Sequence, residues 1–440
     1  EKGTISLWCK GDGLNAANQV LLCNWGDANN HAAVLWNSSS NFDIFDYQSG
    51  YESQIKPSGV FRDPSAWYHL VYTWDAPNGT ENQRNRVWIN GIEQTYSTSS
   101  YYGASDNPAW NKDYTLNIGS RDGTDNYFSG SMSHVYFIQG YTYEADTFGQ
   151  FDATSGIWKI KTSPTINYTG TGTNSCFLKM EDRTNLDLDS GGNTLTFTTA
   201  GTLTPTYDNP SDNFATLNPL HESDPSGNYV LSNGNTTLTV TSNDYQRQVG
   251  VTVLPAGLKG YFEWKAVDDS NYQQGFQVTS IKLGKTNYDT AATGDIYFLT
   301  GDPMRISYSN GGSAATWIAS YFPTWAEGDI MGCAFDFTGT NRNVWFHRNG
   351  TYGNNGSGVG DPAAGTYPAM TSTQLPVTKE FEITHAANSG TTSVTSFNFG
   401  NGYFGTTAIA SAGTNASGIG TFEYDVPTGF TALSTKGLNE

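Results

Sequence analysis

The sequence has few cysteines and few charged residues, and both shortages narrow the class of protein. Four cysteines in 440 residues are too few for a disulfide scaffold, and no CxxC spacing indicates a zinc site. Cys9 and Cys23 lie on two neighbouring apolar runs, so the sequence allows either a bridge between them or two buried free thiols. Lys and Arg number 22 against 41 Asp and Glu, a net charge of -19. Nucleic acid and anionic membranes are therefore not expected partners, because phosphate binding requires basic residues.

Long apolar runs and helix-forming stretches are also missing. No run of about 18 apolar residues is present, so membrane insertion is not expected. Residue 1 is Glu1, without a charged and then apolar signal segment behind it, which suggests a processed chain or a part of a longer one. Instead the chain has 49 glycines and 14% aromatic residues, a composition typical of an all-β protein with many turns.

Short strands separated by turn residues are predicted in both halves of the chain. At residues 4–10, Ile5, Leu7 and Cys9 fall on one face of a strand. Residues 67–74 show little polar alternation, which favours an interior strand covered on both sides. Asn90-Gly91 and Asn349-Gly350 each separate two strand-like runs and predict hairpin turns with positive φ.

The chain is long enough for two domains. Further strands of the first half are predicted at residues 114–119, 132–138 and 176–180. Those of the second half are predicted at residues 237–240, 261–267, 296–299, 330–337, 343–347, 380–384 and 394–399. A polar stretch with two prolines separates the halves. We therefore expect two consecutive antiparallel β-sandwiches, at residues 1–182 and 212–440, joined by a linker at 183–211.

Short motifs in the first half resemble the laminin-G-like, concanavalin A-like jelly roll. They are TISLW (4–8), DPSAWYHLV (63–71), WING (88–91), and IGSRDG (118–123) with YFSG (127–130). The stretches at 61–69 and 147–158 resemble the version found in tail-fibre and appendage proteins of marine tailed bacteriophages. That family usually has a strand before the first motif, where this chain has three residues. An edge strand is therefore expected to be missing, or to come from another segment or subunit.

The second half resembles the SPRY sandwich. The motifs are GDIMGCAFDF (328–337), WFHRNG (345–350), SFNFG (396–400) and PTGFTAL (427–433), and they occur in the order that the family uses. The stretch at 212–220 resembles the lead-in of phage versions. Relatives continue beyond this domain, which suggests a fragment of a longer fibre. SPRY domains bind through loops at one end of the sandwich.

Together these resemblances imply a virion protein, a tail fibre or similar appendage that binds a host cell-surface glycan or receptor protein and contacts other virion subunits. Phage fibres are commonly trimeric, so a homotrimer is a family-level expectation, although no heptad or collagen-like repeat imposes it. The alternative is a purely structural virion protein that decorates the capsid or spaces a fibre. A secreted polysaccharide hydrolase is the least favoured hypothesis.

The sequence lacks complete catalytic patterns, which argues against an enzyme. The glucanase pattern Glu-x-Asp-x-x-Glu begins at Glu144 and Asp146, but its third acidic position is Gly149. Glu380 and Glu382 share a strand face, which we interpret as the solvent face because the residues between and after them are apolar. No histidine pattern indicates a metal, and no paired motif offers a nucleophile.

His69 lies within the aromatic run at 67–74, and we interpret it as a hydrogen-bonded core residue.

The loop at 100–112 is the predicted ligand site. Tyr101, Tyr102, Asp106 and Trp110 combine aromatic rings that could stack on a sugar with a hydrogen-bonding carboxylate. Because glycine and proline interrupt the stretch, we expect these aromatics to face solvent or another subunit rather than the core of their own domain. The alternative is that they cover the edge of the sandwich.

Asp122 and Asp125 are the candidate calcium ligands, since they stand in a glycine-rich turn. The alternative is that they form Asx turns without a metal. No other cofactor is expected.

Overall fold

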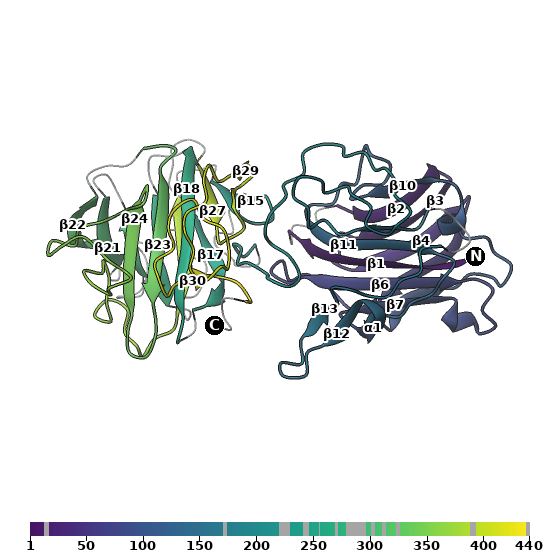
Figure 1. The fold of residues 1–440 in the computed structure, drawn as a ribbon, viewed down its shortest axis with the longest axis horizontal. Coiled ribbons are helices and arrows are strands. Elements are labelled where there is room, and N and C mark those ends of the chain that lie inside the picture. The colour runs from purple at the N-terminus through teal and green to yellow at the C-terminus, as the bar shows by residue number, and fades with distance from the viewer. Residues whose placement is uncertain are drawn as a thin grey trace. The chain divides into compact units, whose positions relative to one another are not determined.

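The computed structural model describes residues 1–12, 17–169, 174–219, 229–240, 246–254, 256–268, 272–278, 296–300, 304–309, 314–322, 326–387 and 393–436. The chain forms two compact units, which Figure 1 shows in one view. The first comprises Glu1–Pro205 and Asn209–Ser211, and the second comprises Thr206–Asp208 and Asp212–Glu440. Each unit is described by itself below.

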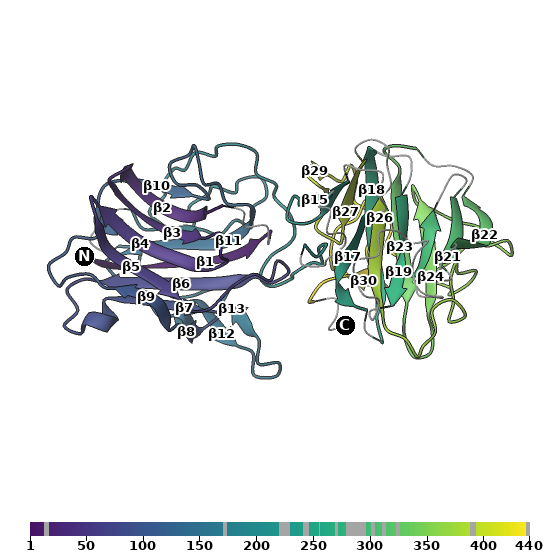
Figure 2. The same cartoon turned by 180° about the vertical axis from the view of Figure 1, so that it is seen from behind.

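The first unit is a sandwich of two six-stranded antiparallel sheets. Sheet A has the order β14 (Cys176–Leu178), β11 (Gly130–Gln139), β1 (Lys2–Gly11), β6 (Tyr68–Asp75), β7 (Asn85–Ile89) and β8 (Ile92–Glu93). Sheet B has the order β10 (Thr115–Ile118), β2 (Gln19–Asp27), β3 (Asn30–Trp36), β4 (Phe42–Gln48), β5 (Tyr51–Pro57) and β9 (Tyr96–Ser100). Figure 2 shows the strands of sheet B side by side.

The main core of this unit lies between the two sheets. Ile5, Leu7 and Cys9 of β1 point into it, as their alternation predicted. The other face of sheet A is covered by α1 (Ala145–Phe148) and by the hairpin of β12 (Gly149–Phe151) and β13 (Trp158–Ile160). β6 is therefore buried on both faces, which confirms the prediction of an interior strand at 67–74.

β1 pairs with β11 on one side and with β6 on the other, so it is an interior strand. The edge beside β11 is taken by β14, which comes from the C-terminal part of the same unit. A later segment of this chain thus forms the edge strand beside β11.

Both asparagine–glycine turns are confirmed. Asn90 and Gly91 have φ of 48° and 79° between β7 and β8. Asn349 and Gly350 have φ of 49° and 78° between β24 (Asn343–Arg348) and β25 (Thr351–Tyr352).

The second unit also consists of two facing sheets. One has the order β15 (Tyr229–Ser232), β16 (Thr237–Val240), β27 (Ser393–Asn398), β18 (Lys259–Asp268), β23 (Ile330–Asp336), β24 and β25, with β30 (Thr431–Ala432) parallel to β18. The other has the order β17 (Gln246–Val253), β26 (Phe381–Ala387), β19 (Tyr272–Val278), β20 (Ile296–Thr300), β21 (Met304–Ser309) and β22 (Ala314–Phe322). A short pair, β28 (Tyr403–Phe404) and β29 (Thr407–Ala408), completes the unit.

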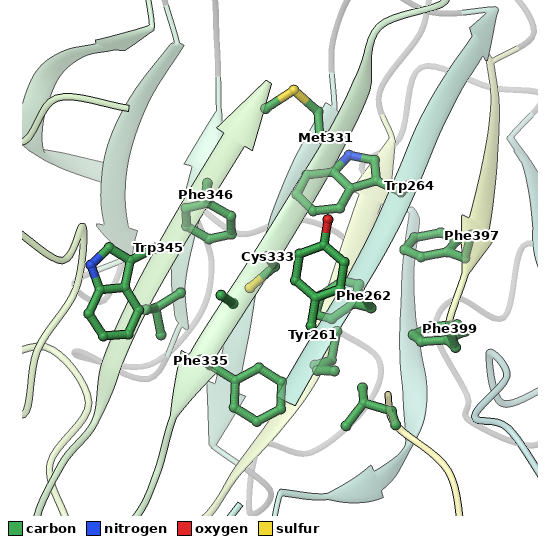
Figure 3. Close-up of a cluster of buried hydrophobic side chains, with 14 of the residues drawn as sticks. Tyr261, Phe262, Trp264, Met331, Cys333, Phe335, Trp345, Phe346, Phe397 and Phe399 are labelled. Atoms are coloured by element: carbon green, nitrogen blue, oxygen red, sulfur yellow. The ribbon is translucent and has the colours of Figure 1, made fainter. Parts of the chain in front are cut away.

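Aromatic side chains dominate the core of the second unit (Figure 3). Phe262 and Trp264 of β18 alternate with Tyr261 and Glu263, as expected for a strand with both faces covered. β23 lies between β18 and β24 and is buried along its length, which confirms it as an interior strand. The segment before β30 covers the face that carries Tyr261.

Glu263 is a fully buried carboxylate that holds this covering segment to β18. It accepts hydrogen bonds from the Tyr261 hydroxyl (2.9 Å), from the Asn398 side-chain amide (3.3 Å), and from the backbone N–H groups of Glu423 and Tyr424 (2.9 Å each). Burial raises the pKa of Glu263 to about 7, and these hydrogen bonds oppose the rise. All these donors are neutral groups, and through them Glu263 ties residues 423–424 and Asn398 to β18.

The polar stretch predicted as a linker is divided between the units. Residues 183–205 belong to the first unit, where isolated bridges join Leu178 to Asp189 and Leu188 to Thr196. Leu195 and Phe197 pack against its main core. The passage between the units is therefore shorter than residues 183–211 suggested.

The four cysteines are free and buried. Cys9 faces the core between the sheets, whereas Cys23 lies on the opposite face of sheet B. The bridge that the sequence left open does not form, because the two thiols belong to different sheets.

Candidate binding face of the first sandwich

The predicted ligand loop is part of the core of its own unit, so that prediction is wrong. Tyr102 and Trp110 are completely buried, and Tyr101 packs partly buried against the same cluster. The Trp110 ring lies 5.8 Å from the ring of Trp74 and 6.3 Å from that of Phe137. The loop runs over the surface, but its large side chains point inward.

Asp46 on β4 explains this orientation. Its carboxylate accepts hydrogen bonds from the Tyr102 hydroxyl (2.8 Å) and the Ala109 backbone N–H (2.6 Å), and so holds the loop to sheet B. On sheet A, the Gln139 side chain donates to the Trp110 carbonyl (2.8 Å). The predicted site residue Asp106 accepts the Gly103 N–H (2.6 Å) in a local turn.

Burial raises the pKa of Asp46 to about 6, while hydrogen bonds from Ala109, Tyr102 and Gln48 oppose the rise. The cause is desolvation inside the sandwich, not a second carboxylate of the kind that glycosidases use. The hydrogen bonds of Asp46 hold the loop at 102–109 to sheet B.

The two candidate calcium ligands have separate partners. Asp122 accepts the Thr124 N–H (2.9 Å) and hydroxyl (2.7 Å), which is the Asx turn that the sequence offered as the alternative. Asp125 pairs with Arg121. In the described part of the chain, no cluster of three or more His, Cys, Asp or Glu side chains could hold a metal ion.

His69 is a hydrogen-bonded core residue, as predicted. The Trp158 indole N–H donates to its Nδ1 (3.0 Å), so in the neutral imidazole the proton is on Nε2, 2.9 Å from the Ser6 hydroxyl. An Nε2 that carries a proton cannot accept one from Ser6, and this pair therefore lacks the arrangement that activates a serine. Burial lowers the pKa of His69 to about 3.

Phe381 and Ile383 lie in the core of the second unit. Glu382, which alternates with them, is half-buried on the other side of the strand, in keeping with the predicted solvent face of this pair.

An aromatic cluster that sequence reasoning missed lies on the outer face of sheet B, the face turned away from the main core. The alternation of β3 and β4 places Ala32, Val34, Phe42 and Ile44 inside. Ala33, Leu35 and Phe45 point outward together with Val20, Cys23 and Trp25 of β2. We call this surface the outer face; its aromatic members are Trp25, His31, Phe45, Tyr47 and Tyr51.

The rings of the outer face contact one another in a chain. His31 lies 4.9 Å from Trp25, 5.5 Å from Phe45 and 5.8 Å from Tyr47. Tyr51 meets Tyr47 at 5.3 Å in an edge-to-face contact. Tyr51 keeps 58% of its surface exposed, whereas Trp25, Phe45 and Tyr47 are half-buried.

Polar groups flank these rings. Asp43 of β4 pairs with Lys56 of β5 (2.9 Å) and accepts hydrogen bonds from Gln54. At the other end, the Arg121 guanidinium lies 5.3 Å above the Trp25 ring, a cation–π contact. An exposed tyrosine with neighbouring amide and charged groups is the arrangement that stacks on a sugar ring and hydrogen-bonds its hydroxyls.

The pKa of His31 is lowered from its ordinary value. Burial, the largest cause, lowers its pKa, and the positive charge of Arg121 lowers it further, while the Asp27 carbonyl and carboxylate oppose this.

The sequence carried a signal for this face. Phe45 and Tyr47 alternate with Ile44 and Asp46, so one row of β4 had to place its aromatics on the side opposite the core. That row becomes a cluster only through the β4–β5 turn, which sets Tyr51 opposite Tyr47.

Comparison with known proteins bears mainly on the first unit. Residues 1–142 match the family model described as the concanavalin A-like lectin/glucanases superfamily. Residues 1–142 are thus similar to concanavalin A-like domains, in line with the motifs of the first half. No curated protein matches the chain.

Among solved structures, the PSpry domain of TRIM65 is similar at 12% identity and a TM-score of 0.30, over 42% of this chain and 88% of that domain. That neighbour is a SPRY domain. Because the identity and the TM-score are low, we describe the architecture of the second unit from the strand order of its own sheets.

Among the described residues, no helix is long and apolar enough to cross a membrane.

Proposed function

We propose that this chain is a non-enzymatic binding protein of a bacteriophage virion appendage, and that its first sandwich binds host-surface glycan through the outer face of sheet B. The observation that carries the glycan site is the exposed Tyr51 ring, supported from below by Tyr47 and Phe45. The concanavalin A-like domain supports it, since that superfamily includes lectins. The appendage assignment rests on the sequence motifs shared with tail-fibre proteins.

Tyr51 is suited to this role for a physical reason. Its ring exposes apolar area to water, and covering such area contributes about 25 cal/mol per Å². The ring is held edge-on by two aromatic neighbours, so little conformational freedom is lost when a sugar covers it. Gln54, the register partner of Phe45, donates its amide N–H to Asp43, and its side-chain carbonyl is a hydrogen-bond acceptor for hydroxyl groups.

A glycan array probed with the full chain tests the proposal. We expect binding to a subset of glycans, and we expect Tyr51→Ala to weaken that binding about tenfold, which corresponds to about 1.4 kcal/mol. The matched control is Phe151→Ala, because Phe151 is an aromatic of similar exposure, 52%, on the β12–β13 hairpin beside sheet A.

Loss of binding in Tyr51→Ala with retention in Phe151→Ala supports the outer face. Equal binding by both variants and the wild type would place the glycan elsewhere. Failure of the wild type to bind any glycan would contradict the proposal and favour the structural virion role, and release of reducing sugar would favour the hydrolase.

A further inference from the structure

The charged groups of the outer face bear on which glycans it can accept. In the described part of this face the cations are Arg121 and Lys56, and each is already paired with a carboxylate. Arg121 pairs with Asp125, and Lys56 pairs with Asp43 at 2.9 Å. The face therefore offers a ligand no uncommitted positive charge.

Carboxylates are in excess beside the same rings. Asp122 lies in the loop that carries Arg121, and this loop lies close enough to β2 for Arg121, Asp122 and Asp125 to influence the Cys23 thiol. Asp27 ends β2 beside Trp25. Because salt screens distant charges, the carboxylates of this face act on a ligand there more strongly than the net charge of the whole chain does.

Lys112 is another cation near sheet B, but its contacts are with Gln48 and Tyr114 rather than with the rings of the outer face. Its ammonium donates to the Gln48 side chain and lies 5.9 Å from the Tyr114 ring. Its charge acts on the buried Asp46. It does not add a cation to the rings around Tyr51.

We propose that the outer face selects neutral glycans, built from uncharged hexose or N-acetylhexosamine units, and rejects their counterparts that carry a carboxylate or sulfate. This inference rests on the proposed glycan-binding function. Both cations of the face are held in ion pairs, so a carboxylate or sulfate on a bound glycan could gain a cationic partner there only by breaking one of these pairs and exposing the carboxylate that it leaves. A neutral sugar needs only the rings and the hydrogen-bonding amide and carboxylate groups.

Asp125 then determines specificity, although it need not touch the sugar. It engages the guanidinium that lies over Trp25, and a free guanidinium would bind a carboxylate in a bidentate manner. Removing the Asp125 charge would free Arg121 for an acidic ligand and remove one repulsive carboxylate.

The test is a glycan array of matched pairs, each a neutral glycan and the same glycan with a terminal uronate, sialate or sulfate. For the wild-type chain we expect the acidic member to bind at least about tenfold more weakly. Asp125→Asn is expected to raise binding of the acidic member several-fold and to change binding of the neutral member less than about threefold.

The matched control is Asp152→Asn, which removes a carboxylate paired with Lys159 (3.0 Å) on the β12–β13 hairpin and changes the net charge equally. It should leave both members unchanged. A gain of acidic binding in Asp152→Asn as large as in Asp125→Asn would reduce the effect to overall charge and overturn the inference.

Equal or tighter binding of the acidic member by the wild type would overturn the inference while leaving the glycan site intact, provided that Tyr51→Ala still weakens binding. If Asp125→Asn fails to fold, Arg121→Gln is measured instead. Binding of the neutral glycan within about threefold of the wild type supports the inference. If the wild type binds an acidic glycan and Arg121→Gln no longer does, the inference is contradicted. Absence of all glycan binding would instead contradict the proposed function.

Discussion

Trp110 gives the sharpest test of how the loop at 101–110 is built. In Trp110→Ala, a completely buried ring that contacts Tyr72, Trp74 and Phe137 is removed from the core between the sheets. Removal of a buried Trp or Phe side chain costs about 3–5 kcal/mol, through lost burial and the cavity that remains. A typical domain is stable by about 5–15 kcal/mol, so the first unit should be strongly destabilised.

The assay is thermal and urea unfolding of the full chain. For a unit of this size, a loss of about 3–5 kcal/mol lowers Tm by roughly 6 to 20 °C. The two units can unfold in separate transitions, and only one should shift. Phe151→Ala, at an exposed position, should stay within about 0.5 kcal/mol of the wild type. A Trp110→Ala variant with unchanged stability and weakened ligand binding would refute the buried arrangement and restore the loop as a binding site.

Three further predictions follow from other parts of the structure. Because burial raises the pKa of Glu263, the native state binds the Glu263 proton more tightly than the unfolded state does, and the resulting stabilisation is largest below about pH 4.5 and is lost as the pH rises towards about 7. In urea unfolding, the stability of the wild type relative to Glu263→Gln should therefore be lower at pH 8 than at pH 5. A stability difference that does not change with pH would contradict this. Gly91→Ala should lower the free energy of unfolding by at least about 1 kcal/mol, because Gly91 has φ of 79° and an added Cβ would meet the Trp158 ring. An unchanged Tm would contradict this and show that the hairpin can relax around the added methyl group. The four thiols should stay unlabelled by a thiol reagent in the native state and react on unfolding, because burial raises the pKa of Cys9 and raises that of Cys23 to about 12; fast native labelling of Cys23 would show that the outer face is open above it.

The strands and turns could be predicted because their signals are local. Alternation at residues 4–10 and the dipeptides Asn90-Gly91 and Asn349-Gly350 specify strand faces and positive φ within a few residues. The strand at 176–180 was predicted, but its pairing with β11 was not, since β11 lies some forty residues earlier in the chain.

The candidate site shows where local reasoning fails. Glycine and proline in the loop at 100–112 correctly predicted that its backbone runs over the surface. The direction of its side chains is determined by Asp46, more than fifty residues earlier, whose buried carboxylate needs hydrogen-bond donors. The outer-face cluster was missed for the same reason, because Trp25, His31 and Tyr51 come together only when β2, β3, β4 and β5 pair.

A crystal structure of the full chain with its best array glycan tests the central claim most directly. The account predicts a neutral sugar ring within about 4 Å of the Tyr51 ring, in contact with the outer face of sheet B. A glycan bound at the loop of residues 101–110, on the second unit, or nowhere on the chain would contradict it.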